Sequence, residues 1–135
     1  MRILAIDIGE KRIGVAAADD RTRVALPLAT VTPNDDIIEA IAHLVEQQQA
    51  EELVVGLPLS LSGALGPQAL RVQALVDALA DRLPIPVRTW DERLTSVQAA
   101  RHQPRGRRRS KGERDALAAA IILQTYLDSQ PRPPR

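Results

Sequence analysis

Residues 2–18 read RILAIDIGEKRIGVAAA, which is two apolar runs joined by a short polar segment. The first run, residues 2–8, is typical of a buried strand, although it carries one carboxylate, Asp7, and stops at Gly9. The second run, residues 13–18, has the same character. Because the connection between them is short, the two runs are predicted to pair as an antiparallel hairpin.

The rest of the chain predicts further strands that alternate with amphipathic helices. Pro27 places the next strand at a sheet edge, because proline has no N–H to donate to a neighbouring strand. Two capping-box pairs, Thr95 with Gln98 and Ser110 with Glu113, predict helix starts. After the hairpin we expect a strand at 24–31, a helix that starts within 33–36, a strand at 53–57, a helix at 67–83, a strand at 85–90, a short helix from 95 to about 102 and a last helix from 110 to about 128. This order predicts an α/β fold with a five-stranded mixed sheet, whose first three strands form an antiparallel meander, and with helices on both faces.

Length and composition restrict the classes of protein. A chain of 135 residues fits one domain, which we expect to span residues 1–129, with residues 130–135 as a disordered tail. There are no cysteines, which excludes disulfides, thiolate zinc sites and a cysteine nucleophile. With one Trp, one Tyr and no Phe, the chain lacks the aromatic platforms on which many single-strand binders stack bases. Residues 3–8 are too short an apolar stretch for a signal peptide or a membrane span, so we expect a cytoplasmic protein.

Basic residues are concentrated near the end of the chain, although the net charge is only +1. Residues 101–114 contain seven Lys or Arg residues and one acidic residue, whereas the remaining chain is net acidic. Such a segment is either a solvated loop or a surface that grips nucleic-acid phosphates, and its attachment to the last helix favours the grip. Lys11 and Arg12, in the predicted hairpin turn, have the same two interpretations. The expected nucleic-acid contacts are Lys11, Arg12, Arg105, Arg107, Arg108, Arg109 and Lys111.

Acidic residues lie at three positions where a carboxylate could bind a metal ion or take part in catalysis. Asp7 lies within an apolar strand, where an ionised carboxylate is costly unless it caps a turn or binds a metal ion. Asp91 and Glu92 follow another apolar strand, either as solvated loop residues or with one of them facing a site. Asp115 is the fifth residue of the last predicted helix, beyond the first turn in which the helix dipole favours an acid. Carboxylates grouped in this way suit hard ions such as Mg²⁺ or Mn²⁺, which hydrolyse phosphodiesters by activating water and stabilising the leaving oxygen.

Four segments of the chain together carry a more specific signal. They are Asp7-Ile-Gly9-Glu-Lys-Arg-Ile-Gly14-Val-Ala, Val55-Gly-Leu-Pro58, Asp91-Glu-Arg-Leu-Thr-Ser96 and Lys111-Gly-x-x-Asp115-x-x-Ala118. In order and spacing these segments resemble the YqgF (RuvX-like) family, and the resemblance extends from Arg2 to about Leu127. Each segment alone is a weak signal, whereas all of them in the correct order are highly specific.

The resemblance implies an RNase H-like fold, related to that of bacterial Holliday-junction resolvases. It implies a nuclease that matures the 5′ end of 16S ribosomal RNA, with Asp7, Glu92 and Asp115 as catalytic metal ligands and Asp91 as the substitute for Glu92. The cofactor would be Mg²⁺ or Mn²⁺. The partner would be nucleic acid, with RNA favoured over DNA. Pre-ribosomal particles are a further candidate partner. We expect no membrane association, and a monomer or a homodimer.

Other functions share some of these features. A structure-specific DNA nuclease would cut the same phosphodiester bond in branched DNA. A fragment of the actin and sugar-kinase superfold also has an Asp-x-Gly loop, but that superfold needs two such domains around its nucleotide. A non-catalytic RNA-binding or ribosome-assembly factor would keep the fold without the reaction.

Overall fold

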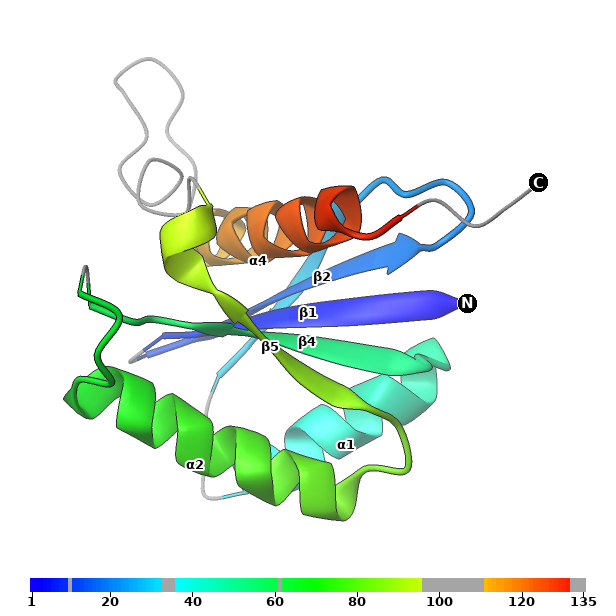
Figure 1. Ribbon diagram of the computed structural model, residues 1–135. Helices are drawn as coiled ribbons and strands as arrows, with labels where there is room; N and C mark the ends of the chain where they lie inside the picture. Colours follow the sequence, from blue (N-terminus) through cyan, green and yellow to red (C-terminus); the bar gives the residue numbers. More distant parts are fainter. Residues whose placement is uncertain (10, 33–35, 61, 96–110, 132–135) are drawn as a thin grey trace.

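The computed structural model of this chain describes residues 1–9, 11–32, 36–60, 62–95 and 111–131. Figure 1 shows a twisted sheet with helices on both faces. In chain order the elements are β1 (Arg2–Ile8), β2 (Ile13–Asp19), β3 (Leu26–Val31), α1 (Ile37–Gln48), β4 (Glu52–Leu57), α2 (Pro67–Arg82), β5 (Val87–Asp91), the 3₁₀ helix η1 (Glu92–Leu94) and α4 (Lys111–Ser129).

The sheet has five strands in the order β3-β2-β1-β4-β5. The first three strands form the predicted antiparallel meander, because β2 pairs antiparallel with both β1 and β3. β4 then lies parallel to β1, and β5 parallel to β4. β3 occupies an edge, which is the position that Pro27 predicts. The expected five-stranded mixed sheet is therefore confirmed.

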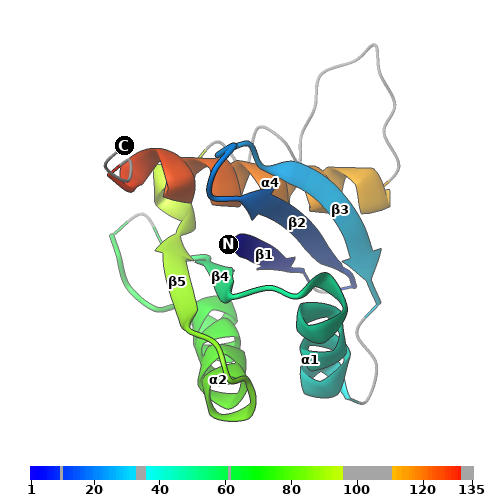
Figure 2. The ribbon, with the colours of Figure 1, turned by 90° about the vertical axis from the view of Figure 1, so that its right-hand side faces the viewer.

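Helices cover the two faces of the sheet unequally. α4 lies across one face, and α1 and α2 lie together on the other (Figures 1 and 2). The core beneath α4 is rich in alanine, with Ala16 and Ala18 of β2 against Ala118, Ala119 and Ala120 of α4. These small side chains allow the helix to approach the sheet closely. The core beneath α1 and α2 is built from larger Leu, Ile and Val side chains.

The starts of α1 and α2 follow local sequence chemistry. α1 begins after Asp36, whose side chain accepts a hydrogen bond of 3.2 Å from the backbone N–H of Glu39. This cap confirms the helix start that was expected within residues 33–36. α2 begins at Pro67, a residue suited to the first turn because its missing N–H would have no partner there. No helix within the described residues has both the length and the apolar character needed to cross a bilayer.

A turn that the sequence did not predict follows β5. It is a single 3₁₀ turn at Glu92–Leu94, and Thr95 ends it. The hydroxyl of Thr95 donates a hydrogen bond of 2.9 Å back to the carbonyl of Glu92, which closes this turn. The rest of the expected helix, the Ser110 cap and residues 132–135 of the expected tail lie outside the described residues.

Candidate active site

Asp7 is the most buried carboxylate of the described residues, at 2% exposure. Side chains alternate along a strand, and Asp7 faces α4 together with Ile3 and Ala5 of the same strand. The β1–β2 register pairs Asp7 with Gly14. The parallel register pairs Ile6 with Val55, so one residue further along both strands Gly56 stands on the other side of Asp7. A buried carboxylate is thus flanked on both neighbouring strands by residues without side chains.

Gly14 allows α4 to contact the sheet beside Asp7. A Cβ atom at this position would overlap the backbone carbonyl of Asp115, with the backbone nitrogen of Ala116 at 2.9 Å. The first turns of α4 therefore lie directly on β2, and they bring Asp115 to the row that contains Asp7. Sequence alone did not assign this role to Gly14, although an isolated glycine inside a strand commonly marks a close backbone approach.

Gly56 provides the same space on the opposite side. A Cβ atom there would lie 3.3 Å from both Cγ and Oε2 of Glu92, and 2.6 Å from Cδ1 of Ile122. The side chain of Glu92 therefore lies over β4 at the position next to Asp7. The side chains of Asp7 and Glu92 and the backbone of Asp115 therefore lie along one row on the α4 face of the sheet.

Asp91 is engaged elsewhere, by its neighbour Arg93. The two side chains form an ion pair of 2.6 Å, and Asp91 Oδ1 also accepts a hydrogen bond of 2.9 Å from the backbone N–H of Arg93. Hydrogen bonding to the Arg93 side chain holds the pKa of Asp91 below its usual value. Asp91 thus caps η1, and the geometry favours Glu92 over Asp91 as the residue that faces Asp7.

Arg12 extends from the β1–β2 turn to Asp115. Its Nε lies 2.8 Å from Asp115 Oδ2, and both side chains are partly buried, at 30% and 23% exposure. The turn that positions Arg12 is tight, because the N–H of Gly9 donates to the carbonyl of Arg12 at 3.0 Å. A Cβ atom on Gly9 would lie 2.7 Å from that same oxygen, so this turn requires glycine. In this structure a guanidinium, rather than solvent, neutralises the carboxylate of Asp115.

The donor set fits a hard divalent cation in its chemistry, since Asp7, Glu92 and Asp115 offer only carboxylate oxygens. The positions of these side chains, however, do not form a complete metal site. Within the part of the chain that the structure describes, no three Asp, Glu or His side chains form a group that could hold a metal ion. The ion pair between Arg12 and Asp115 is one reason, because it directs that carboxylate toward the hairpin turn.

The predicted nucleic-acid contacts are placed only in part. Lys11 is exposed in the β1–β2 turn, whereas Arg12 is paired with Asp115. Lys111 begins α4, but its side chain lies outside the described residues, as do the remaining predicted contacts, Arg105, Arg107, Arg108 and Arg109.

Comparison with known proteins identifies the family of this chain. The model of the RuvX family, described as "Holliday junction resolvase", matches residues 1–129. A protein of Chloroflexus aggregans with the name "Putative pre-16S rRNA nuclease" is 46% identical, covering 97% of this chain and 96% of its own. A protein of the same name from Caldanaerobacter subterraneus subsp. tengcongensis is 43% identical, with coverage of 96% and 98%.

Solved structures show the same fold at much lower identity. Thermus thermophilus RuvC in complex with a Holliday junction substrate superposes with a TM-score of 0.58 at 17% identity, covering 94% of this chain and 93% of that one. The Fowlpox virus resolvase, in a complex with Holliday junction DNA, gives a TM-score of 0.59 at 10% identity, with coverage of 96% and 98%. These neighbours confirm the RNase H-like fold. Because the family model matches nearly the whole chain and relatives above 40% identity span almost all of it, this protein belongs to the RuvX family.

Proposed function

We propose that this protein is a metal-dependent nuclease that hydrolyses phosphodiester bonds in the 5′-end processing of pre-16S ribosomal RNA. Residues 1–129 form its single catalytic domain, and Asp7, Glu92 and Asp115 hold Mg²⁺ or Mn²⁺. The observation that carries the proposal is the row of Gly14, Asp7 and Gly56, in which both glycines make room for the elements that bear the other two carboxylates. The names of its relatives support the substrate.

Each of the three residues is held in position by an element of secondary structure. Asp7 is fixed by a strand in the centre of the sheet, Glu92 by the 3₁₀ turn that Asp91 caps, and Asp115 by the contact of α4 with β2. Rigid elements hold reacting groups more precisely than loops do. The chemistry that a bound divalent cation supplies is the activation of a water molecule and neutralisation of charge on the leaving oxygen.

Arg12 supplies a cation at the edge of the same row. Among the described residues, the Arg12 side chain donates a hydrogen bond to Asp115 alone, through Nε. The two terminal nitrogens of a guanidinium form a fork that matches a phosphate. We infer that Arg12 contacts the substrate phosphate, and that it neutralises Asp115 when neither metal nor substrate is bound.

The test is a cleavage panel with pre-16S RNA, unrelated single-stranded RNA and a DNA four-way junction, each with Mg²⁺ and with Mn²⁺. We expect the precursor RNA to be cut most rapidly, and Asp7→Asn to abolish cleavage. Asp77→Asn, an exposed carboxylate on α2, is the matched control and should cut normally. Preferential cutting of the junction would instead favour the DNA resolvase function. Intact nucleic acid in every arm would favour a non-catalytic binding protein and contradict the proposal.

A further inference from the structure

A cavity lies on the α1 and α2 face of the sheet, just beyond the end of β1. It is a cavity of about 540 Å³ between α1 and α2, and its lining residues are Ile8, Gly9, Ile37, Gln68, Arg71, Val72 and Leu75. This volume is within the range of small-molecule sites in proteins. Gly9 is two residues from Asp7, so the cavity and the row of carboxylates are on opposite sides of the same strand end.

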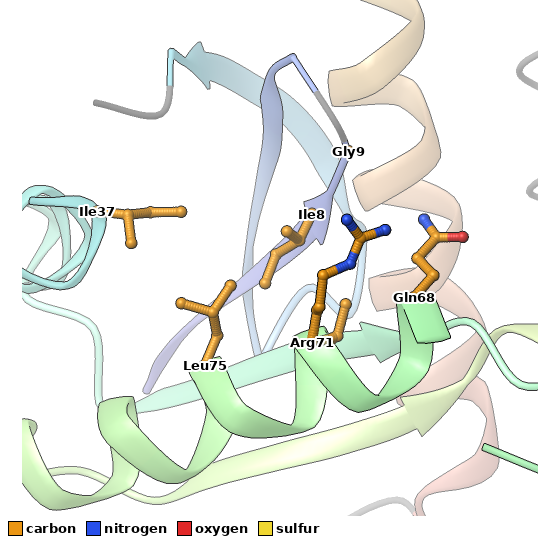
Figure 3. A pocket seen from close by; sticks show the side chains of 7 residues that line it. Ile8, Gly9, Ile37, Gln68, Arg71 and Leu75 are labelled. Atoms are coloured by element: carbon orange, nitrogen blue, oxygen red, sulfur yellow. The ribbon is translucent and has the colours of Figure 1, made fainter. Parts of the chain in front are cut away.

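The cavity combines an apolar floor with polar side chains on one wall. Figure 3 shows Arg71 and Gln68 extending from α2 toward Gly9, with Ile8, Ile37 and Leu75 around the space. Arg71 is exposed and has no ion pair or hydrogen bond within the described residues. An unpaired guanidinium beside an apolar surface is suited to a ligand that has both an anionic group and an apolar body.

We propose that this cavity is a nucleotide subsite, which binds one nucleotide of the substrate strand where that strand passes the end of β1. Arg71 binds a backbone phosphate of that nucleotide, Gln68 donates a hydrogen bond to it, and the base or sugar lies on Ile8, Val72 and Leu75. The inference rests on the proposed nuclease function for its biological meaning, because that function brings a nucleic-acid strand to the end of β1. None of the lining residues that the structure describes is aromatic, so the base would be held by apolar contacts that every base can make, and we expect little preference among bases.

Binding can be measured without any metal or cleavage. Isotope-labelled protein in EDTA is titrated with adenosine 5′-monophosphate, and the NMR signals of Ile8, Gly9 and Val72 are followed. We expect those signals to shift, with similar affinity for uridine 5′-monophosphate and much weaker binding of adenosine or of inorganic phosphate alone. Arg71→Gln should weaken AMP binding about tenfold or more, because a charge-assisted hydrogen bond to phosphate is lost. Arg71→Lys should recover part of the loss.

Arg82→Gln is the matched control, since Arg82 is on the same helix but is engaged by Glu39 at the other end. It should bind AMP as the wild type does. In cleavage assays, Arg71→Gln should raise the KM for RNA and leave kcat nearly unchanged. The inference is overturned if AMP shifts none of the cavity signals at millimolar concentration, or if Arg71→Gln binds AMP like the wild type. Cleavage without AMP binding would contradict the subsite alone, whereas AMP binding without any cleavage would contradict the nuclease function alone.

Discussion

Asp91 and Glu92 are neighbours in the chain but have different surroundings. Arg93 pairs with Asp91 and keeps it on the turn, whereas Glu92 lies over Gly56 beside Asp7. Sequence motifs left both residues as candidate ligands, because an extended dipeptide presents its two side chains to opposite sides. The 3₁₀ turn that starts at Glu92 is what separates their roles.

The two residues should therefore differ in mutant kinetics. Glu92→Gln should lower the cleavage rate about 100-fold or more, because it removes a charge that stabilises the reacting centre. Asp91→Asn keeps a side-chain oxygen that can accept from the backbone N–H of Arg93, so its rate should fall less than about tenfold. Initial rates at saturating Mn²⁺ provide the measurement. A larger loss in Asp91→Asn than in Glu92→Gln would assign the site to Asp91.

A variant of Arg12 tests whether its guanidinium competes with the metal ion for the carboxylate of Asp115. Arg12→Gln should tighten Mn²⁺ binding by about threefold to tenfold, because the ion no longer displaces a partly buried cation from the carboxylate. The same variant should bind RNA more weakly, since it loses a phosphate contact. Calorimetric titration with Mn²⁺ gives the affinity, and Arg82→Gln serves as the control because its ion pair is remote. Weaker Mn²⁺ binding in Arg12→Gln would mean that Arg12 orients Asp115 for the metal.

At the scale of elements, the contact between α4 and β2 is the feature that positions Asp115. Gly14→Ala should force the helix away from the sheet, because the added methyl group overlaps the Asp115 carbonyl. Overpacking of this kind costs roughly 1–3 kcal/mol in the free energy of unfolding. Gly66→Ala is the control, since a Cβ atom there meets nothing within 4 Å and φ is −75°. Its cost should stay below about 1 kcal/mol.

Urea unfolding of both alanine variants gives these free energies, and cleavage assays give the effect on the site. Gly14→Ala should lose activity even under conditions in which it remains folded. Equal stability of the two variants, or a fully active Gly14→Ala protein, would contradict the packing of α4 described above.

The other end of α4 is held to β4 by a buried polar contact. The hydroxyl of Tyr126 donates a hydrogen bond to Glu52, which also pairs with Arg88 at 2.7 Å. Burial, together with the hydrogen bond to Glu52, raises the pKa of Tyr126 to about 12. The folded protein therefore keeps the phenol protonated at a pH where the unfolded chain, with a tyrosine pKa of about 10, releases the proton.

This shift predicts a loss of stability at high pH. The contribution of Tyr126 is fully present below about pH 10, and it is lost as pH rises through about 12, with a total of about 2–3 kcal/mol. The free energy of unfolding, measured by urea titration between pH 9 and 12, should fall more steeply in the wild type than in Tyr126→Phe. Parallel curves for the two proteins would show that the phenol is not held in its neutral form.

At the scale of the whole molecule, the sheet was the most predictable part. The hairpin, the parallel strands and the edge position of β3 follow from apolar runs, short connections and Pro27, which are local properties of the sequence. The turn at Glu92–Leu94 was missed because its capping residue, Asp91, also completes the preceding strand. A pattern of apolar residues does not show which of two adjacent acids ends a strand.

The candidate site was predictable as a set of residues but not as an arrangement. The motifs of the RuvX family indicate Asp7, Glu92 and Asp115, whereas the spaces at Gly14 and Gly56 that bring them to one row depend on contacts between distant segments. The pairing of Arg12 with Asp115 and the cavity beside Arg71 have no local signal in the sequence. Such features arise only when the elements are packed.

We propose that Asp7 belongs to a divalent metal site. The most direct measurement is a titration of the protein with Mn²⁺, in which electron paramagnetic resonance reports the free ion. We expect the wild type and Asp77→Asn to bind Mn²⁺ with the same affinity. Asp7→Asn should bind it at least about tenfold more weakly, because one of the ligating carboxylates is lost. It should remain folded, with equal or slightly higher thermal stability, since a repelling charge is gone from the row. A folded Asp7→Asn protein that binds Mn²⁺ as tightly as the wild type would show that Asp7 is not a metal ligand.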